Sequence, residues 1–258
     1  MMHTQTSLLP EYAGSGPAVI EPSRVVGQGV RLPTRAVLCM LGDVLEQLAQ
    51  QPDVTIVHHL KSEMGTHPVY TLGTGRHRVA VFNPGMGGAM AAAGMERIIA
   101  LGAARIIACG GAGVLRKDLA PGSVIIPTGA IRDEGTSFHY QLRSRTNHPH
   151  TAAVMALKSA CKRHGTRFVT GLTWTTDALF RETPRKVRAR LREGCLTVEM
   201  EAAALFAVAR FRKIAFAQVL YAGDDVSGKE WDARRWPGWV SARQKLFMLA
   251  IDAVRRMR

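Results

Sequence analysis

The sequence predicts an α/β domain in which helices cover a largely parallel, twisted sheet. Short apolar runs rich in valine and isoleucine alternate with longer segments of helical periodicity. This alternation is typical of α/β folds, because crossover helices join parallel strands and bury them on both faces. Glycines directly after three helical segments (Gly102, Gly165 and Gly194) mark expected helix ends.

The individual elements follow from the local period of the apolar residues. Strands are expected at 37–41, 79–82, 105–109, 124–126, 168–172 and 214–221, where the runs are short and apolar. Helices are expected at 43–50, 89–101, 151–164, 184–193, 199–211 and 240–257, where apolar residues recur every three or four positions. Ligands of open α/β sheets bind at the carboxyl ends of strands, so the Gly-rich segments after strands are the expected contact points.

The chain is expected to form one main domain. No Ser/Gly-rich or charge-rich linker divides its 258 residues, so we predict an N-terminal arm at 1–30 and a single domain at 31–258. The longest apolar stretches, at 98–101 and 214–222, are far shorter than the roughly 18 residues of a membrane span. The N-terminus also lacks the pattern of a secretory signal. We therefore expect a cytoplasmic protein without membrane association.

The charge balance is unusually basic. There are 34 Lys and Arg residues against 20 Asp and Glu, a formal net charge of +14, which would attract phosphates or nucleic acid. The basic residues gather at 181–192 and 255–258, without the interleaved aromatic residues that stack on bases. We interpret these runs as solvated helix faces and do not expect a nucleic acid partner.

Cysteine and histidine give no metal-binding pattern. The four cysteines, Cys39, Cys109, Cys161 and Cys195, contain no CxxC pair and are interpreted as reduced, packed thiols. The histidine groups at 58–59 and 148–150 lack the spacing and partners of a zinc site and are interpreted as surface or loop residues. No metal is expected.

Two Gly-rich segments could contact a ligand. Gly85 and Gly87 lie in a turn between an expected strand and helix, where backbone amides at a helix N-terminus can approach a ligand closely. Gly110 and Gly111 lie in a second expected turn after another strand. Small residues there leave room for a planar ring, although close packing of a strand and a helix would use the same residues.

Two acidic pairs could carry proton chemistry. Glu199 and Glu201 begin an otherwise apolar helix, and a charged cap explains one of them better than two. Asp224 and Asp225 end an apolar strand. Apolar surroundings raise the pKa of such an acid, which suits proton donation at neutral pH; an Asp-rich turn is the alternative.

The motifs GMGGA, ACGGAG, WTTDALF, TVEMEAAALF and YAGDD occur in this order. With them, residues 36–227 resemble the nucleoside phosphorylase superfamily, which includes purine nucleoside phosphorylases, uridine phosphorylases and methylthioadenosine/S-adenosylhomocysteine nucleosidases. The resemblance implies a three-layer α/β/α sandwich around a mixed, mainly parallel twisted sheet that curls into a distorted barrel. It also implies cleavage of a nucleoside N-glycosidic bond, a homo-oligomer (dimer or hexamer), and neither a metal nor a redox cofactor.

The same resemblance assigns a ribose site. Met200 would pack on the sugar and Glu201 would accept both vicinal hydroxyls, with Glu199 beside them. A fixed carboxylate on the diol stabilises the oxocarbenium-like sugar of the transition state better than it stabilises the ground state.

The resemblance also assigns a site for the base. Asp224 would protonate a purine leaving group, with Asp225 the less favoured choice. Phe180 would stack on the base, with Leu179 beside it.

The sequence departs from the phosphorylases at the phosphate site. Two arginines and a Thr or Ser that grip phosphate in relatives correspond here to Glu46, Ala108 and Gly111. A carboxylate and a methyl group cannot replace two guanidinium groups, and hydrolytic nucleosidases use a carboxylate at the first position as the general base on water. Hydrolysis, with Glu46 and Asp224 as catalytic residues, is therefore favoured.

Two alternatives stay open. The first is phosphorolysis of a purine nucleoside or uridine with inorganic phosphate as co-substrate, in which Lys61 or an arginine of a neighbouring subunit would supply the anion contact. The second is a non-catalytic binder of nucleosides or nucleic acid, which the net charge motivates.

Overall fold

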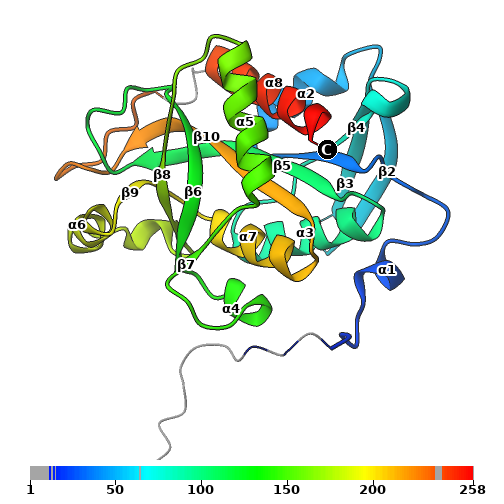
Figure 1. Ribbon diagram of the computed structural model, residues 1–258, viewed down its shortest axis with the longest axis horizontal. Helices are drawn as coiled ribbons and strands as arrows, with labels where there is room; N and C mark the ends of the chain where they lie inside the picture. Colours follow the sequence, from blue (N-terminus) through cyan, green and yellow to red (C-terminus); the bar gives the residue numbers. More distant parts are fainter. Residues whose placement is uncertain (1–11, 13, 15, 64, 236–239, 258) are drawn as a thin grey trace, which may run out of the picture.

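The computed structural model describes residues 12, 14, 16–63, 65–235 and 240–257. Within them, a mixed ten-stranded sheet lies between two layers of helices (Figure 1). One face packs against α2 (Gly42–Ala49), α5 (Thr151–Arg163) and α8 (Val240–Arg256), and the other packs against α3 (Gly88–Ala100) and α7 (Ala202–Phe211). The predicted three-layer α/β/α fold is confirmed.

The strands are, in chain order, β1 (Arg35–Cys39), β2 (Thr55–Ser62), β3 (Gly65–Leu72), β4 (Val79–Phe82), β5 (Arg105–Val114), β6 (Val124–Asp133), β7 (Thr146–Asn147), β8 (Phe168–Thr176), β9 (Cys195–Glu199) and β10 (Ala215–Asp225). The sequence analysis missed β2, β3, β7 and β9. It did not predict the β2–β3 hairpin because both strands are mostly exposed or half-buried and carry polar residues, so they contain no apolar run.

Short elements complete the chain. They are α1 (Pro22–Val25), the 3-10 turns η1 (Gly75–His77) and η2 (Leu179–Arg181), α4 (Ser137–Tyr140) and α6 (Pro184–Arg192). After α1, Val26 and Leu32 are buried in the core layer that contains α3 and α7. Residues 1–11 of the predicted arm lie outside the described residues.

Strand β5 organises the sheet. One edge pairs in parallel with β1 and then, at Gly113 and Val114, antiparallel with β9, while β10 pairs in parallel along the strand. From β10 the pairing continues through β6 and β8 to β9 and so returns to β5, which closes a five-stranded barrel. Strands β1, β4, β3 and β2 extend the sheet from it. This is the distorted barrel that the resemblance implied.

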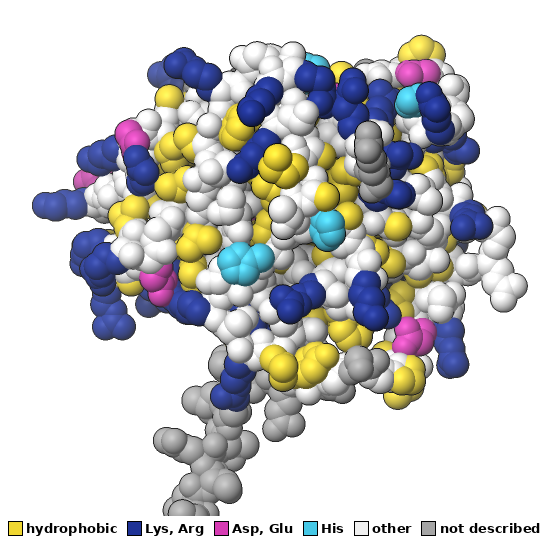
Figure 2. Space-filling model, viewed as in Figure 1, with side chains coloured by type: hydrophobic (Ala, Val, Ile, Leu, Met, Phe, Trp, Pro, Cys, Tyr) yellow, Lys and Arg dark blue, Asp and Glu magenta, His cyan; other side chains and the backbone are white. Residues whose placement is uncertain are grey.

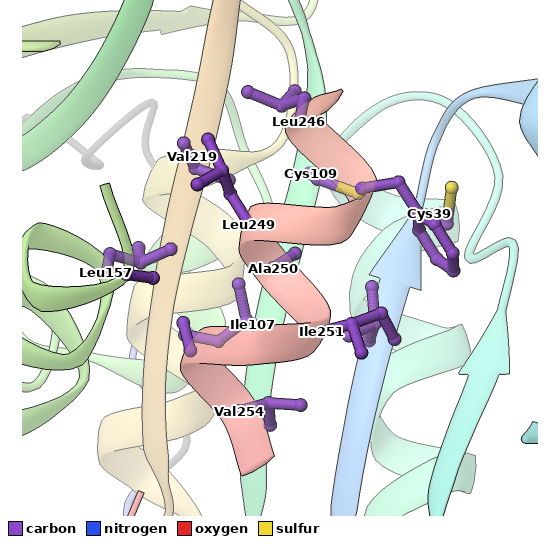
Figure 3. Close-up of a cluster of buried hydrophobic side chains, with 14 of the residues drawn as sticks. Cys39, Ile107, Cys109, Leu157, Val219, Leu246, Leu249, Ala250, Ile251 and Val254 are labelled. Atoms are coloured by element: carbon purple, nitrogen blue, oxygen red, sulfur yellow. The ribbon is translucent and has the colours of Figure 1, made fainter. Parts of the chain in front are cut away.

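The core beneath α5 and α8 packs against the first half of β5 and of β10. Ile107, Cys109 and Val219 project from the sheet toward Leu157 of α5 and toward the apolar face of α8, namely Leu246, Leu249, Ala250, Ile251 and Val254 (Figure 3). All four cysteines are free and buried. No helix in the described part of the chain is long and apolar enough to span a membrane.

Three predicted boundaries are wrong in ways that matter for function. Strand β5 runs through the expected Gly-rich turn at 108–113, and β10 runs through Asp225, because both continue as partners in the barrel. Helix α7 begins at Ala202 rather than at 199, because residues 197–199 pair with β8 and, in part, with β5. Gly110, Gly111 and Glu199 are therefore strand residues.

Candidate active site

A cavity of about 420 Å³ opens where several strands end. Its volume lies in the range of roughly 300–1,000 Å³ that is typical of small-molecule sites. The lining comes from the ends of β5, β9 and β10, from the segments after β1 and β4, and from elements near η2, α7 and α8, namely Met40, Leu41, Asn83, Gly85, Met86, Gly110, Gly111, Ala112, Gly113, Leu179, Glu182, Val198, Glu199, Met200, Glu201, Tyr221, Gly223, Asp224 and Arg243. The cavity therefore lies where the topology predicts a ligand site.

Glu201 is held in this cavity by backbone amides. The Gly87 N–H donates to its Oε1 at 2.6 Å, and the Met200 N–H donates to its Oε2 at 3.3 Å. Gly87 has a φ of 86°, a left-handed conformation that favours glycine. Burial raises the pKa of Glu201, while the two amides lower it. The turn before α3 thus aims this carboxyl group, although Gly87 is not itself among the lining residues.

Glu199 caps a helix as well as lining the cavity. Its Oε2 accepts hydrogen bonds from the N–H groups of Glu201 at 2.8 Å and Ala202 at 2.6 Å, at the start of α7. Its Oε1 accepts the Thr175 hydroxyl at 2.6 Å. Burial, and then the charge of Glu201, raise the pKa of Glu199 to about 8. Three hydrogen bonds from protein groups thus make Glu199 the cap of α7, and its predicted contact with the ribose stays a prediction.

The two acids at the end of β10 have different surroundings. Asp224 lines the cavity, and its Oδ2 accepts a hydrogen bond from Trp231 Nε1 at 2.7 Å. Asp225 pairs with Arg234 at 2.6 Å and accepts the Ser227 N–H at 2.7 Å. Burial opposes ionisation of Asp225, but these contacts hold its pKa below its usual range. Asp224 is therefore the acid available to a ligand.

Two charged residues that the sequence analysis did not single out also line the cavity. Burial, and then the charge of Asp224, raise the pKa of Glu182 to about 7, while Lys186 opposes that shift. Arg243 of α8 lies 3.0 Å from an Asp43 carboxyl oxygen. One sequence signal pointed to Glu182, since it is the one acid in the basic run 181–192; no local signal marked Arg243.

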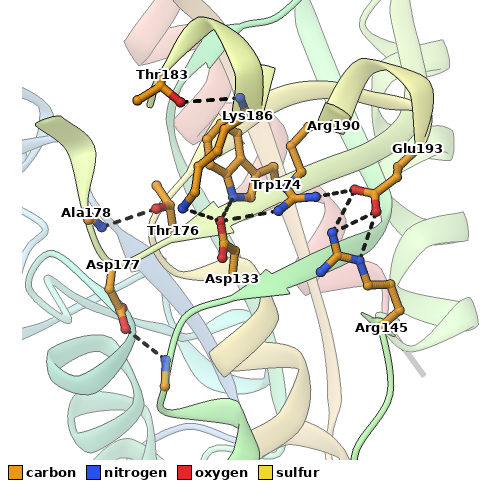
Figure 4. Close-up of polar contacts among 11 residues, drawn as sticks. Asp133, Arg145, Trp174, Thr176, Asp177, Ala178, Thr183, Lys186, Arg190 and Glu193 are labelled. Atoms are coloured by element: carbon orange, nitrogen blue, oxygen red, sulfur yellow. Dashed lines mark hydrogen bonds and ion pairs between the residues drawn. The ribbon is translucent and has the colours of Figure 1, made fainter. Parts of the chain in front are cut away.

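An ionic network anchors α6, which follows the cavity-lining η2 turn. Asp133 accepts hydrogen bonds from Trp174 Nε1 at 2.9 Å and Lys186 Nζ at 3.0 Å, and lies 3.5 Å from Arg190 (Figure 4). Glu193 pairs with Arg190 at 2.6 Å and with Arg145 at 2.7 Å. Part of the basic run at 181–192 therefore has a structural role next to the cavity.

The expected base-stacking residue lies elsewhere. Leu179 lines the cavity, whereas Phe180 is 94% exposed and does not line it. In a 3-10 turn, successive side chains point about 120° apart, so the two neighbours face different ways. A base in this cavity would contact Leu179, and Phe180 is not supported as its stacking partner within one subunit.

The expected phosphate-site positions also differ from their predicted setting. Glu46 lies on the exposed face of α2, whose other face buries Val44 and Leu45, and it does not line the cavity. Lys61 is exposed on β2. Gly111 lies against the Tyr221 ring, 3.1 Å from where a Cβ would stand, so its small size serves packing as well as the cavity.

Comparison with known proteins identifies the family of the chain. Residues 34–249 match the family model of the Phosphorylase superfamily. The chain is 33% identical over 153 residues to a uridine phosphorylase of Treponema pallidum (strain Nichols) and 30% identical over 132 residues to a guanosine phosphorylase of Halorubrum lacusprofundi. These matches cover 55% and 51% of the chain and 59% and 55% of the relatives, so the chain spans less than two thirds of either.

A solved structure is similar over most of its length. The AMP nucleosidase from Bacteroides thetaiotaomicron VPI-5482 superposes with a TM-score of 0.70 at 27% identity, covering 86% of this chain and 87% of that one. The chain belongs to the phosphorylase superfamily, whose members are nucleoside phosphorylases and nucleosidases. Enzymes of this superfamily cleave N-glycosidic bonds.

Proposed function

We propose that this enzyme hydrolyses the N-glycosidic bond of a purine nucleoside and releases the free base and the sugar. The observation that carries the choice of water over phosphate is the charge of the cavity. Four carboxyl side chains line it, from Glu182, Glu199, Glu201 and Asp224, whereas Arg243 is the one Lys or Arg among the described lining residues. Its guanidinium already pairs with Asp43. The described part of the cavity therefore lacks the free cationic contacts that hold a phosphate dianion, whereas a neutral nucleoside and water do not need them.

Glu201 supplies the stabilisation of the sugar. Each oxygen of a carboxylate has about two lone-pair sites, so Glu201 can keep its amide contacts and still accept the two ribose hydroxyls. Met200, next to it in the lining, would pack against the sugar. Positive charge develops on the ring as the bond to the base breaks, and the fixed carboxylate then interacts more strongly than in the ground state.

Asp224 supplies the leaving-group proton. The proton passes from its carboxyl group to the purine N7, and the electron pair of the C1′–N9 bond moves to the base, which leaves neutral. Water adds to C1′ of the oxocarbenium-like sugar and loses a proton to solvent, and solvent reprotonates Asp224. An acid at this position favours a purine, because protonation of a ring nitrogen is the purine route. We do not propose Glu46 as the base on water, because it lies outside the cavity.

Phosphorolysis is the second candidate, favoured by the names of the uridine and guanosine phosphorylases to which the chain is similar. Arg243 would then be the phosphate contact within one subunit, with a further cation from a neighbouring subunit. The third candidate, a nucleic acid binder, has less support, because Lys and Arg side chains are scattered over the face in Figure 2 rather than gathered into one continuous patch.

The oligomeric state, the location and the cofactor requirement of the enzyme are also proposals. We propose a homo-oligomer, dimer or hexamer, supported by exposed apolar side chains at and beside the cavity, Met86, Leu179 and Phe180. We also propose a cytoplasmic enzyme that needs no metal or redox cofactor, since none of the steps above uses one.

The test is release of free base from a panel of purine and pyrimidine nucleosides, with and without inorganic phosphate, with the sugar product identified. Phosphate-independent formation of free sugar supports hydrolysis. Strict phosphate dependence with a sugar 1-phosphate product refutes it in favour of phosphorolysis. Glu201→Gln and Asp224→Asn should both lose turnover, with the exposed Glu46→Gln as the matched control. Binding of nucleosides without any turnover would refute the enzymatic proposal.

A further inference from the structure

The segment 226–235, which we call the strap, folds back onto the end of β10. Asp225 and Asp232 exchange both backbone hydrogen bonds, at 2.8 and 3.1 Å. The Arg234 guanidinium donates to Asp225 Oδ2 at 2.6 Å and to the Leu119 carbonyl at 2.7 Å. Arg234 also has a φ of 46°, an uncommon conformation for a residue other than glycine. Several contacts thus fix the strap to the barrel independently of its tryptophan.

The strap places Trp231 next to Asp224, the proposed acid. The bridge between Asp225 and Asp232 is antiparallel, so Trp231 lies opposite Val226 and diagonally from Asp224, a separation that a long aromatic side chain can span. The indole Nε1, which can only donate a hydrogen bond, lies 2.7 Å from Asp224 Oδ2. The ring is 64% exposed, so it is not a core side chain.

The other oxygen of Asp224 lies beside a residue without a side chain. A Cβ added to Gly113 would stand 3.4 Å from Oδ1, and Gly113 lines the cavity. One carboxyl oxygen is therefore held by Trp231 on the strap, and the other is next to the space that a ligand would occupy.

We propose that Trp231 is a positioning residue for Asp224, in addition to the proposed function on which this inference rests. Its N–H orients the carboxyl group so that Oδ1 carries the proton toward the base. When that proton moves to the purine N7, Asp224 becomes a carboxylate, and the hydrogen bond from Trp231 becomes charge-assisted and stronger. The contact therefore stabilises the transition state for leaving-group protonation more than the ground state.

The experiment compares two leaving groups in the full-length enzyme. Trp231→Phe keeps an aromatic ring and removes the N–H donor, and Lys229→Ala, an exposed change in the same strap, is the matched control. The substrates are the purine nucleoside that the wild type cleaves best and 4-nitrophenyl β-D-ribofuranoside, whose nitrophenolate leaves without a proton. We expect Trp231→Phe to lower kcat on the purine nucleoside by about tenfold or more with little change in KM. Nitrophenyl riboside cleavage and both activities of Lys229→Ala should stay near wild type.

Two results would overturn the inference while leaving the proposed function intact. One is a kcat of Trp231→Phe on the purine nucleoside equal to that of the wild type. The other is an equal loss on both substrates, which would indicate a general structural role. An inactive wild type on every nucleoside would instead refute the proposed function, and the inference with it.

Discussion

The buried carboxyl pair Glu199 and Glu201 makes a prediction about stability and pH. Replacing Glu199 with Gln keeps a carbonyl oxygen for the N–H groups of Glu201 and Ala202, and the new amide can donate to the Thr175 hydroxyl. The variant therefore preserves the cap of α7 while removing a buried group that ionises. The two proteins should differ mainly in how their stability changes with pH.

The magnitude follows from the raised pKa. In the folded protein, burial and the charge of Glu201 raise the pKa of Glu199 from 4.5 to about 8. A group with a raised folded pKa contributes its full stability below the unfolded value, and that contribution is lost as the pH rises through the folded value. At about 1.4 kcal/mol per pKa unit, the wild type should lose up to about 5 kcal/mol between roughly pH 4.5 and 8 through this group. Glu199→Gln should not show this loss.

The assay is urea unfolding of both proteins at a series of pH values from about 5 to 8.5, at one protein concentration. The stability of Glu199→Gln relative to wild type should increase steadily across this range. Glu201→Gln is the control: it removes the neighbouring charge that raises the pKa of Glu199, so the decline seen in the wild type should end at a lower pH. Parallel curves for wild type and Glu199→Gln would refute the assignment of Glu199 as a buried group with a raised pKa.

Four further predictions concern the site. Glu201→Ala should reduce turnover by at least about 100-fold with the fold retained, measured as base release alongside circular dichroism, and near-wild-type activity would rule Glu201 out as the ribose carboxylate. Glu46→Gln should leave kcat/KM unchanged, because the side chain lies on the exposed face of α2; a large loss would return it to the list of catalytic candidates. Gly87→Ala should lower stability by about 1 kcal/mol in urea unfolding and also lower kcat, because a Cβ is disfavoured at a φ of 86° and the amide that holds Glu201 would move; unchanged kinetics would contradict that link. Gly111→Ala should raise KM, because its Cβ would stand 3.1 Å from the Tyr221 ring and displace it; an unchanged KM would mean that Tyr221 does not shape the substrate space.

Local sequence patterns predicted most of the fold. Most central strands and the long helices α2, α3, α5, α6, α7 and α8 follow from apolar periodicity and helix stops, because burial of one face imposes that period on the residues themselves. The β2–β3 hairpin did not follow, because two mostly exposed strands need no apolar run. The end of β5 at Val114 and the end of β10 at Asp225 did not follow either, since they depend on partners in the closed barrel.

Local motifs predict which kinds of residue meet at the strand ends: small residues after β4 and within β5, a Met-Glu pair before a buried helix, and an acid pair at the end of β10. The folded chain then sets the role of each one. It made Glu199 a cap and Asp225 an anchor, placed Phe180 in solvent, and brought Glu182 and Arg243 to the cavity. The physical reason is that these roles depend on contacts between distant residues. One hydrogen bond joins Gly87 to Glu201, which are 114 positions apart in the sequence, and no local pattern predicts that pairing.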